Sequence, residues 1–384
     1  MGFHKSTVFA SFFFLTSFAQ TILIAVLPLE ALRLMGSARE VSLVYFAVGL
    51  MGFTGRLAVP LLTHAMGRFG VFAMGAGVLC LSAALLAGET RPGLVLGLGL
   101  NVFALACFEI VLNLYVLDQI ARPELARFEA KRIFAAAAPY TLGPWLGVYL
   151  QQNLAPWVPF ALAGAAALIF LAYFRASRLG AAEASYPGMR RRLNPALYLY
   201  RFFAQPRLRL AWILAAGRTA WWGMFQIYAP IFAVKSGLGD QVGGAIVSIG
   251  LGWMWSVPFW GWVGRRFGLR RLLMLGYGAT GLVTLAAALL MGTSLVGAAV
   301  LVVSALAAET LDGAGNTLYL RAVHPHERAE MTAVFITYRD FAQLAPPALF
   351  AALLAVFELP AVFIAGGTMM LGMAALTRYI PRRL

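Results

Sequence analysis

Acidic side chains of this chain occur inside long apolar stretches, where charge is costly. Glu109 precedes Asn113 by one helical turn, and Glu309, Asp312 and Asn316 follow an i, i+3, i+7 spacing on one helical face. A charge at the bilayer centre costs about 2.5–3.5 kcal/mol on an insertion scale, so it normally faces a partner or a cavity. Low-dielectric surroundings favour the protonated form of a carboxyl, which suits proton exchange. We predict that Glu109 first, and Asp312 with it, couple to protons.

Two arginines of the second half are suited to bind a polar or anionic group of a substrate. Arg218 stands close in sequence to two tryptophans and a tyrosine, and Arg339 stands between Tyr338 and Asp340. Aromatic side chains near them would cover an apolar part of the same molecule. The predicted substrate-binding residues are Gln20, Asn113, Arg218, Trp221, Trp222, Tyr228, Glu309, Asn316, Tyr338, Arg339 and Asp340.

A structural interpretation of these charges is also open. Arg339 would then pair with Glu309 or Asp312 as a clamp between helices, because an unpaired charge is expensive in lipid. Glu109 has no basic neighbour in its own stretch, so it is either protonated or paired with an arginine of the other half. The residue types alone leave the clamp and the binding site as alternatives.

The elements that carry these residues belong to a sequence that repeats. The matched pairs include Pro28 with Pro230, Gly49 with Gly250, Gly67 with Gly268, Pro123 with Pro325 and Pro144 with Pro346, at separations of 201 or 202 residues. The acid-xxx-Asn pattern of residues 109–113 recurs in residues 312–316. Paired halves in a membrane protein indicate a transporter whose site lies between them.

Composition predicts an all-α integral membrane protein. Of 384 residues, 61% are hydrophobic and 12% charged, against about 45–50% and about 25% in soluble chains; the mean hydropathy is +0.80. Twelve transmembrane helices in two pseudo-symmetric six-helix bundles fit this length at about 20 apolar residues each. We place the helices at 8–34, 41–63, 70–88, 93–119, 132–151, 156–175, 210–235, 241–263, 270–291, 295–320, 331–355 and 359–379.

The chain is expected to divide into three parts. Residues 1–178 and 209–384 form the two bundles, and residues 179–208 form a cytoplasmic linker that is rich in arginine and proline. Part of the linker, residues 193–203, has the pattern of an amphipathic helix that lies on the membrane face.

The net charge of +15 is distributed as in a membrane protein. Basic residues cluster in alternate inter-helix segments, which places these segments and both termini in the cytoplasm. We expect a multi-pass protein of a bacterial-type inner membrane whose basic face contacts anionic lipid headgroups. Nucleic acid is not an expected partner.

Cysteine and histidine give no sign of a disulfide framework or a metal site. Cys80 and Cys107 both fall in apolar stretches, and the four histidines are scattered. No phosphate-binding loop is present, and the first apolar run lacks the features of a cleavable signal. We expect no enzymatic activity, no cofactor and no metal. The expected partners of a monomer are a small-molecule substrate, protons and membrane lipids.

Two loops resemble the signature loop of the major facilitator superfamily. One copy contains His64, Gly67 and Arg68 after the second predicted helix, and the other contains Arg265 and Gly268 after the eighth. The acid of the family's loop is absent from both copies, where His64 and Arg265 stand instead. The resemblance implies that these five residues help to gate the cytoplasmic side.

A second pattern, around Gly143, Pro144 and Gly147, resembles a motif that the family associates with export by antiport. Ordinary close packing of helices explains the same glycines, so Gly143 and Pro144 are candidates for gating. The resemblance implies a secondary transporter that works by alternating access. We expect proton-coupled export of an amphiphilic drug or metabolite; the alternatives are proton-coupled uptake of an organic anion and a lipid-handling flippase.

Overall fold

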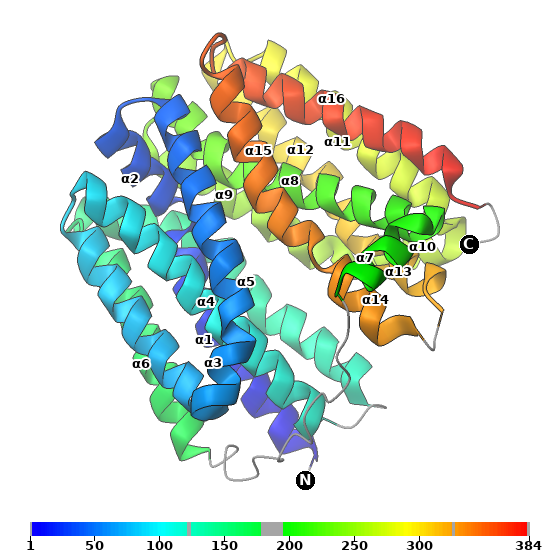
Figure 1. The fold of residues 1–384 in the computed structure, drawn as a ribbon. Helices are drawn as coiled ribbons and strands as arrows, with labels where there is room; N and C mark the ends of the chain where they lie inside the picture. Colours follow the sequence, from blue (N-terminus) through cyan, green and yellow to red (C-terminus); the bar gives the residue numbers. More distant parts are fainter. Residues whose placement is uncertain (1, 121–123, 178–194, 325–326, 382–384) are drawn as a thin grey trace. The chain divides into compact units, whose positions relative to one another are not determined.

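The computed structural model describes residues 2–120, 124–177, 195–324 and 327–381 (Figure 1). Within these ranges the regular elements are all helical, so the predicted all-α fold is confirmed. The contacts divide the chain into two compact units. Unit 1 comprises Met1–Ser185 and Asp240–Ser248, and unit 2 comprises Tyr186–Gly239 and Ile249–Leu384.

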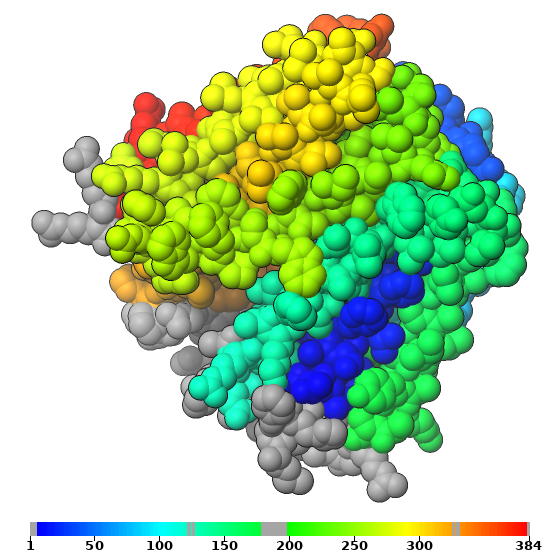
Figure 2. All heavy atoms as spheres, turned by 180° about the vertical axis from the view of Figure 1, so that it is seen from behind, coloured from blue at the N-terminus to red at the C-terminus, as the bar shows by residue number. Residues whose placement is uncertain are grey.

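Unit 1 contains the helices of the first half and the beginning of one helix of the second. Its helices are α1 (Gly2–Ile24), α2 (Val26–Met35), α3 (Ala38–Ala87), α4 (Arg91–Gln119), α5 (Leu125–Asn153) and α6 (Val158–Ala176), with the start of α9 (Asp240–Gly252). On the face in Figure 2, α1 in blue lies between α5 in teal and α6 in green, as the contacts of α1 with both also show.

The core of unit 1 is aromatic. Phe12 and Phe72 are fully buried and meet the rings of α6, with centroid distances of 5.3 Å from Phe12 to Phe170 and 4.9 Å from Phe72 to Phe174. Edge-to-face ring pairs of this kind add about 0.5–1.5 kcal/mol beyond the burial of their area. They hold α1, α3 and α6 together around α4, whose Phe108 packs on Phe170 at 5.0 Å.

Unit 2 contains the linker helix and the remaining helices. They are α7 (Pro195–Ala204), α8 (Pro206–Lys235), the end of α9, η3 (Trp253–Ser256), α10 (Val257–Phe267), α11 (Leu269–Leu289), α12 (Ser294–Ala314), α13 (Thr317–Ala322), α14 (Arg328–Phe335), α15 (Tyr338–Leu353), α16 (Pro360–Leu376) and η5 (Thr377–Tyr379). Four predicted spans are interrupted: 8–34 at Ala25, 241–263 by η3, 295–320 at Gly315, and 331–355 between α14 and α15.

The structure accounts for all twelve predicted spans. Within the described residues, nine helical stretches are long and apolar enough to cross a membrane. One of them, Ala38–Ala87, has 50 residues, whereas a span needs about 20, and it is divided at Gly67. Helix α8 and the pair α14–α15 complete the twelve helices, which confirms the predicted count.

The two signature loops share one backbone feature. Gly67 has φ +73° and ψ +169°, and Gly268 has φ +96° and ψ +138°. A residue with a Cβ rarely adopts such a positive φ, whereas glycine does so at little cost. One glycine therefore turns the chain between two spans in each half, and the loop of the first half is shorter than the six residues that we predicted.

Local sequence starts several of the helices. The Ser37 Oγ accepts a hydrogen bond from the backbone N–H of Glu40 at 3.2 Å, and the Thr90 Oγ1 accepts one from Gly93 at the same distance. These N-caps satisfy N–H groups that have no partner within the helix. Proline occupies the first turn of α4, α6, α8 and α16, where its missing N–H is harmless.

The predicted amphipathic segment of the linker is a helix, α7. Its Phe202 is fully buried, whereas Leu199 and Tyr200 are exposed. Arg201 forms an ion pair with Glu327, just before α14. These contacts attach α7 to unit 2; the rest of the linker, residues 179–194, lies outside the described residues.

Candidate functional site

The best-defined polar cluster of unit 2 surrounds Arg218. This arginine lies in the middle of α8 and is only 9% exposed. Helix α8 packs against α12, α13, α15 and α16, so its charged side chain points into a protein interior rather than into lipid. A buried guanidinium needs hydrogen-bond acceptors for several of its N–H groups. The break between α12 and α13 provides them.

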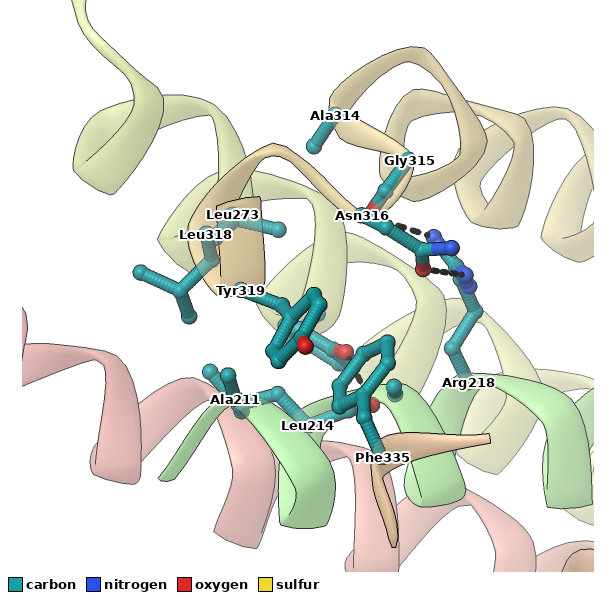
Figure 3. Close-up of a pocket in the computed structure, with 12 residues that line it drawn as sticks. Ala211, Leu214, Arg218, Leu273, Ala314, Gly315, Asn316, Leu318, Tyr319 and Phe335 are labelled. Carbon is teal, nitrogen blue, oxygen red and sulfur yellow. Dashed lines mark hydrogen bonds between the residues drawn. The ribbon is translucent and has the colours of Figure 1, made fainter. Parts of the chain in front are cut away.

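Four acceptors from one segment surround the Arg218 guanidinium. Figure 3 shows those of Gly315 and Asn316. The Arg218 Nη1 donates to the carbonyl oxygens of Leu311, at 3.2 Å, and Gly315, at 3.1 Å. Its Nη2 donates to Asn316 Oδ1 at 3.5 Å, and its Nε lies 3.4 Å from Asp312 Oδ1. One cation thus neutralises a carboxylate and also saturates the carbonyls at the end of α12.

Asp312 has a second partner on the same face of α8. The Trp222 indole Nε1 donates to Asp312 Oδ2 at 2.8 Å. Trp222 follows Arg218 by one helical turn, so both side chains reach α12 together. The Asp312 side chain is 33% exposed, which leaves one edge of the carboxylate accessible. The structure therefore brings together four of the predicted site residues: Arg218, Trp222, Asp312 and Asn316.

Glu309 is the most deeply buried acid of this region. It lies one turn before Asp312 in α12 and is 4% exposed. Among the described residues, none gives its carboxyl a hydrogen bond or an ion pair. An isolated carboxylate is costly in such surroundings, whereas a neutral acid is tolerated. Glu309 is thus the carboxyl of this cluster that most needs a proton.

The other aromatic candidates of α8 lie inside unit 2. Trp221 is fully buried, stacks on Phe225 at 5.4 Å and donates from Nε1 to Thr284 Oγ1 at 3.0 Å. Tyr228 is also fully buried and meets the Phe350 ring edge-on at 5.3 Å. In this conformation both side chains serve packing, and Trp222 is the tryptophan of the pair that contacts a charged side chain, Asp312.

The arginine of α15 is arranged differently from Arg218. Arg339 is exposed, and its guanidinium carbon lies 5.9 Å from the centroid of the Tyr338 ring. Tyr338 is 3% exposed and Asp340 is half-buried. The cation that lies against Asp312 is Arg218. An arginine of α8 thus holds Asp312, and the predicted clamp by Arg339 stays a prediction.

The candidates of unit 1 are more accessible. Glu109 is exposed and Asn113 is half-buried, on a helix α4 that runs without interruption to Gln119. Gln20 of α1 is also exposed, and its Oε1 accepts a hydrogen bond from the Tyr140 hydroxyl at 3.4 Å. Each of these side chains is thus more exposed than that of Arg218.

The loop residues of the two halves differ in their partners. Arg68 is buried, with its Nη1 2.5 Å from Asp118 Oδ2 and its guanidinium carbon 5.1 Å from the centroid of the Tyr115 ring. This ion pair joins the Gly67 turn to the end of α4. His64 and Arg265, which replace the family's loop acid, are both exposed.

The glycines of α5 pack against α1. A Cβ at Gly143 would lie 2.4 Å from Thr21 Oγ1, and one at Gly147 would lie 1.9 Å from the carbonyl oxygen of Ile22. On the start of α9, a Cβ at Gly244 would meet the Pro144 carbonyl oxygen at 3.2 Å. At Gly143 and Gly147 only glycine permits these close approaches, so the motif has a packing role here whatever its part in gating.

Sequence reasoning missed a buried acid in the middle of helix α2. Glu30 is 3% exposed; its carboxylate pairs with Arg33 at 2.7 Å and accepts a hydrogen bond from Gln151 at 3.3 Å. Arg33 also pairs with Glu89 at 2.9 Å. The signal was an acid and a base three residues apart in an apolar stretch. No group of three potential metal ligands occurs among the described residues.

The family model of the Major Facilitator Superfamily matches residues 9–347. This chain belongs to that superfamily. No curated protein matches the chain by sequence. Among the solved structures that share the fold is the nucleoside transporter NupG, with 13% identity, a TM-score of 0.75, and coverage of 97% of this chain and 98% of that chain. A POT family transporter in complex with 5-aminolevulinic acid has 12% identity, a TM-score of 0.77, and coverage of 97% of this chain and 95% of that chain. A D-xylose-proton symporter has 14% identity, a TM-score of 0.77, and coverage of 99% of this chain and 98% of that chain.

Family and fold together confirm the general functional prediction. The protein is a multi-pass membrane transporter of the Major Facilitator Superfamily and not an enzyme. At identities of 12–14%, the solved structures show that this chain shares their fold, but they do not identify its substrate.

Proposed function

We propose that this transporter exports an amphiphilic small molecule in exchange for protons, as a monomer that works by alternating access. The observation that carries the proton coupling is the pair of carboxyls on α12. Glu309 is buried without an ion pair, and Asp312, one turn later, shares Arg218 with the carbonyls at the end of α12. In such different surroundings the two acids gain different amounts of free energy from protonation, and proton coupling requires such a difference.

The two acids would have different roles in this proposal. Glu309 carries the proton, because a carboxylate at its depth lacks compensation. Asp312 senses whether Glu309 carries the proton. Its exposed edge can contact a substrate or water, while Arg218 binds its other oxygen. Glu109 stays a proposed proton acceptor of unit 1, and its exposure makes it the more accessible of the proposed acids.

The proposed substrate contacts follow from the side chains that stay accessible. Asn113 and Asn316 would hydrogen-bond a polar group, and the exposed Arg339 would attract an anionic one. Trp222, which is half-buried beside Asp312, would cover an apolar part. The glycine–proline pattern of α5 supports export through its resemblance to the antiport motif of the family.

The proposed orientation has both termini in the cytoplasm of a cell with a bacterial-type inner membrane. Exposed arginines at the turn between α10 and α11, among them Arg265, Arg266 and Arg271, support it. Labelling of terminal tags in intact and in opened cells tests this orientation.

Proton coupling is tested with purified protein in liposomes. A thermal-shift screen of drugs, metabolites and lipids at two pH values first identifies a ligand. Substrate-dependent proton flux is then measured for the wild type, Glu309→Gln and Glu109→Gln, with Glu358→Gln, an exposed acid next to α16, as the control. We expect Glu309→Gln to bind ligand without moving protons. Normal flux in both Glu309→Gln and Glu109→Gln would contradict proton coupling by these acids.

The direction of coupling has its own test, which does not depend on how the protein inserts into the liposome. Antiport loads substrate into vesicles with an acidic interior, whereas symport loads vesicles in an acidic medium. Loading under the second condition alone would replace export with proton-coupled uptake. Scrambling of labelled lipid without substrate transport would favour the flippase.

A further inference from the structure

We infer that Arg218 and Asp312 lock a two-state break in the tenth transmembrane helix, and that neutralising Asp312 lets this helix close into a continuous one. The lock lies wholly within unit 2. Its link to transport rests on the proposed proton coupling, whereas the lock itself can be tested without any substrate.

The break is localised at one residue. Helix α12 ends at Ala314, α13 begins at Thr317, and Gly315 between them has φ +51° and ψ −133°. This conformation is accessible to glycine and strained for residues with a Cβ. The N–H of Gly315 still donates to the carbonyls of Leu311 and Asp312, at 3.2 and 3.0 Å. The chain therefore leaves the helix abruptly rather than fraying.

Arg218 bridges the break. It contacts Leu311 and Asp312 before Gly315, and the Gly315 carbonyl and Asn316 after it. A cation at this place also stabilises the end of α12, because the C-terminus of a helix carries partial negative charge. Only Asp312 among these acceptors is charged, so it contributes the part of the attraction that a proton can remove.

The alternative state is visible elsewhere in the chain. In the first half the same acid-xxx-Asn pattern, residues 109–113, lies inside the continuous helix α4. Its fourth residue is Leu112, in place of Gly315. Thr16 stands at the position of Arg218, and its hydroxyl bonds to carbonyls of its own helix. Without the glycine and the arginine, this segment of the fold is helical. Glycine costs only about 1 kcal/mol within a helix, so the second half can adopt that state as well.

The surroundings of Arg218 allow the exchange. A cavity of about 20 Å³ lies beside it, lined by α8, α11, α13 and α14, and has room for about one water molecule. A guanidinium that leaves Asp312 can be solvated there. The other titratable groups described near Arg218 are Glu309 on α12, Tyr277 on α11, Tyr319 on α13 and Tyr338 on α15.

Movement at Gly315 would not stay local. Tyr319 of α13 stacks on Phe335 of α14 at 4.0 Å, and its hydroxyl is 2.8 Å from Thr332 Oγ1. Helices α13 and α14 are thus joined by a flat ring contact and a hydrogen bond. Closing the break would rotate both together, and the carboxyl of Asp312 would become free for a new partner.

Hydrogen exchange with mass spectrometry tests the lock on the purified full-length chain. In the broken state the N–H groups of residues 316–319 start a new helix and lack intrahelical acceptors, whereas a continuous helix supplies them. We expect these amides to exchange more slowly, by roughly tenfold or more, in Asp312→Asn and in Arg218→Gln. Arg218→Lys should lie between, because lysine keeps the charge but not the fork geometry. The matched control is Asp240→Asn, which removes the charge from a half-buried partner of Gln152 in unit 1.

A purely structural role for Arg218 gives the opposite result. Faster or unchanged exchange of these amides in Asp312→Asn and Arg218→Gln would overturn the lock. As a second measurement, Gly315→Leu installs the residue of the first half and disfavours the broken state. We expect protected amides and a retained thermal transition; faster exchange would overturn the alternative state. Loss of proton coupling in Glu309→Gln with unchanged exchange in Asp312→Asn would leave the proposed function standing without the lock.

Discussion

The two copies of the acid-xxx-Asn pattern adopt different structures. In α4 the pattern stays helical and Glu109 is exposed. In the second half the helix breaks at Gly315, and Asp312 is held by two side chains of α8. The difference teaches that the shared pattern only places an acid and an amide on one face. A glycine in the segment and an arginine on the neighbouring helix decide whether the backbone continues.

In the signature loops the backbone conformation is the same in both halves, whereas the side-chain contacts differ. Gly67 and Gly268 share a positive φ, so the turn itself is common to both halves. The charges around it are not, because Arg68 is buried against Asp118 while Arg265 is exposed. Backbone geometry is thus repeated where glycine demands it, and side-chain contacts have diverged.

The largest expected difference between the halves is in the loss of stability on substitution at matching positions of α5 and α15. Gly147 faces the Ile22 carbonyl, whereas Leu349, its counterpart 202 residues later, is 55% exposed. Gly147→Leu should destabilise the protein by about 3 kcal/mol or more, because α1 and α5 must separate. Leu349→Gly should cost only about 1 kcal/mol. Thermal unfolding in detergent measures both, and equal effects would show that α5 is not packed more closely than α15.

The next largest difference in stability is expected between substitutions of Arg218 and of its counterpart Thr16. Arg218→Ala removes the cation from Asp312 and one donor from each of two carbonyls, and should cost about 2 kcal/mol, discounted for the partial exposure of Asp312. Thr16→Ala removes only hydroxyl bonds within α1 and should change stability by roughly 0.5 kcal/mol or less. Denaturation curves of both variants provide the comparison. A small effect of Arg218→Ala would contradict a role for Arg218 in holding the break.

A smaller effect is expected at the loop of the first half. Arg68→Leu, which installs a buried leucine like Leu269 of the second half, should cost about 1–2 kcal/mol because Asp118 loses its cation. The double variant Arg68→Leu/Asp118→Asn should recover much of this loss, and a double-mutant cycle measures the coupling. Additive effects of the two substitutions would show that the pair contributes no interaction energy.

The smallest predicted effect compares Trp222 with Gln20 of the first half. Trp222→Phe keeps the ring but removes the indole N–H from Asp312, and should cost about 1 kcal/mol. Gln20→Ala removes a long hydrogen bond at an exposed site and should cost roughly 0.3 kcal/mol. Thermal unfolding of the two variants side by side checks the order. A larger loss for Gln20→Ala would mean that the polar contacts of α1 matter more than those of α8.

Much of the fold follows from the sequence because membrane helices have strong local signals. Apolar runs of the right length predict the twelve spans, and α7 is recognisable from its amphipathic pattern. The repeat also pairs Gly67 with Gly268, whose shared backbone conformation the structure confirms. The sequence did not predict the broken helix, because a glycine inside a helical pattern is tolerated and does not by itself mark a break.

The candidate site was likewise predicted only in part from the sequence. Sequence determined which residues carry unusual charge for a membrane interior, since a carboxyl or guanidinium there is costly wherever it points. It did not decide their burial or their partners. Glu109 is exposed and Glu309 is buried, although both lie in apolar helices, and Arg218 of α8 meets Asp312 of α12. Those outcomes depend on which helix face meets which neighbour, and only tertiary packing sets that relation.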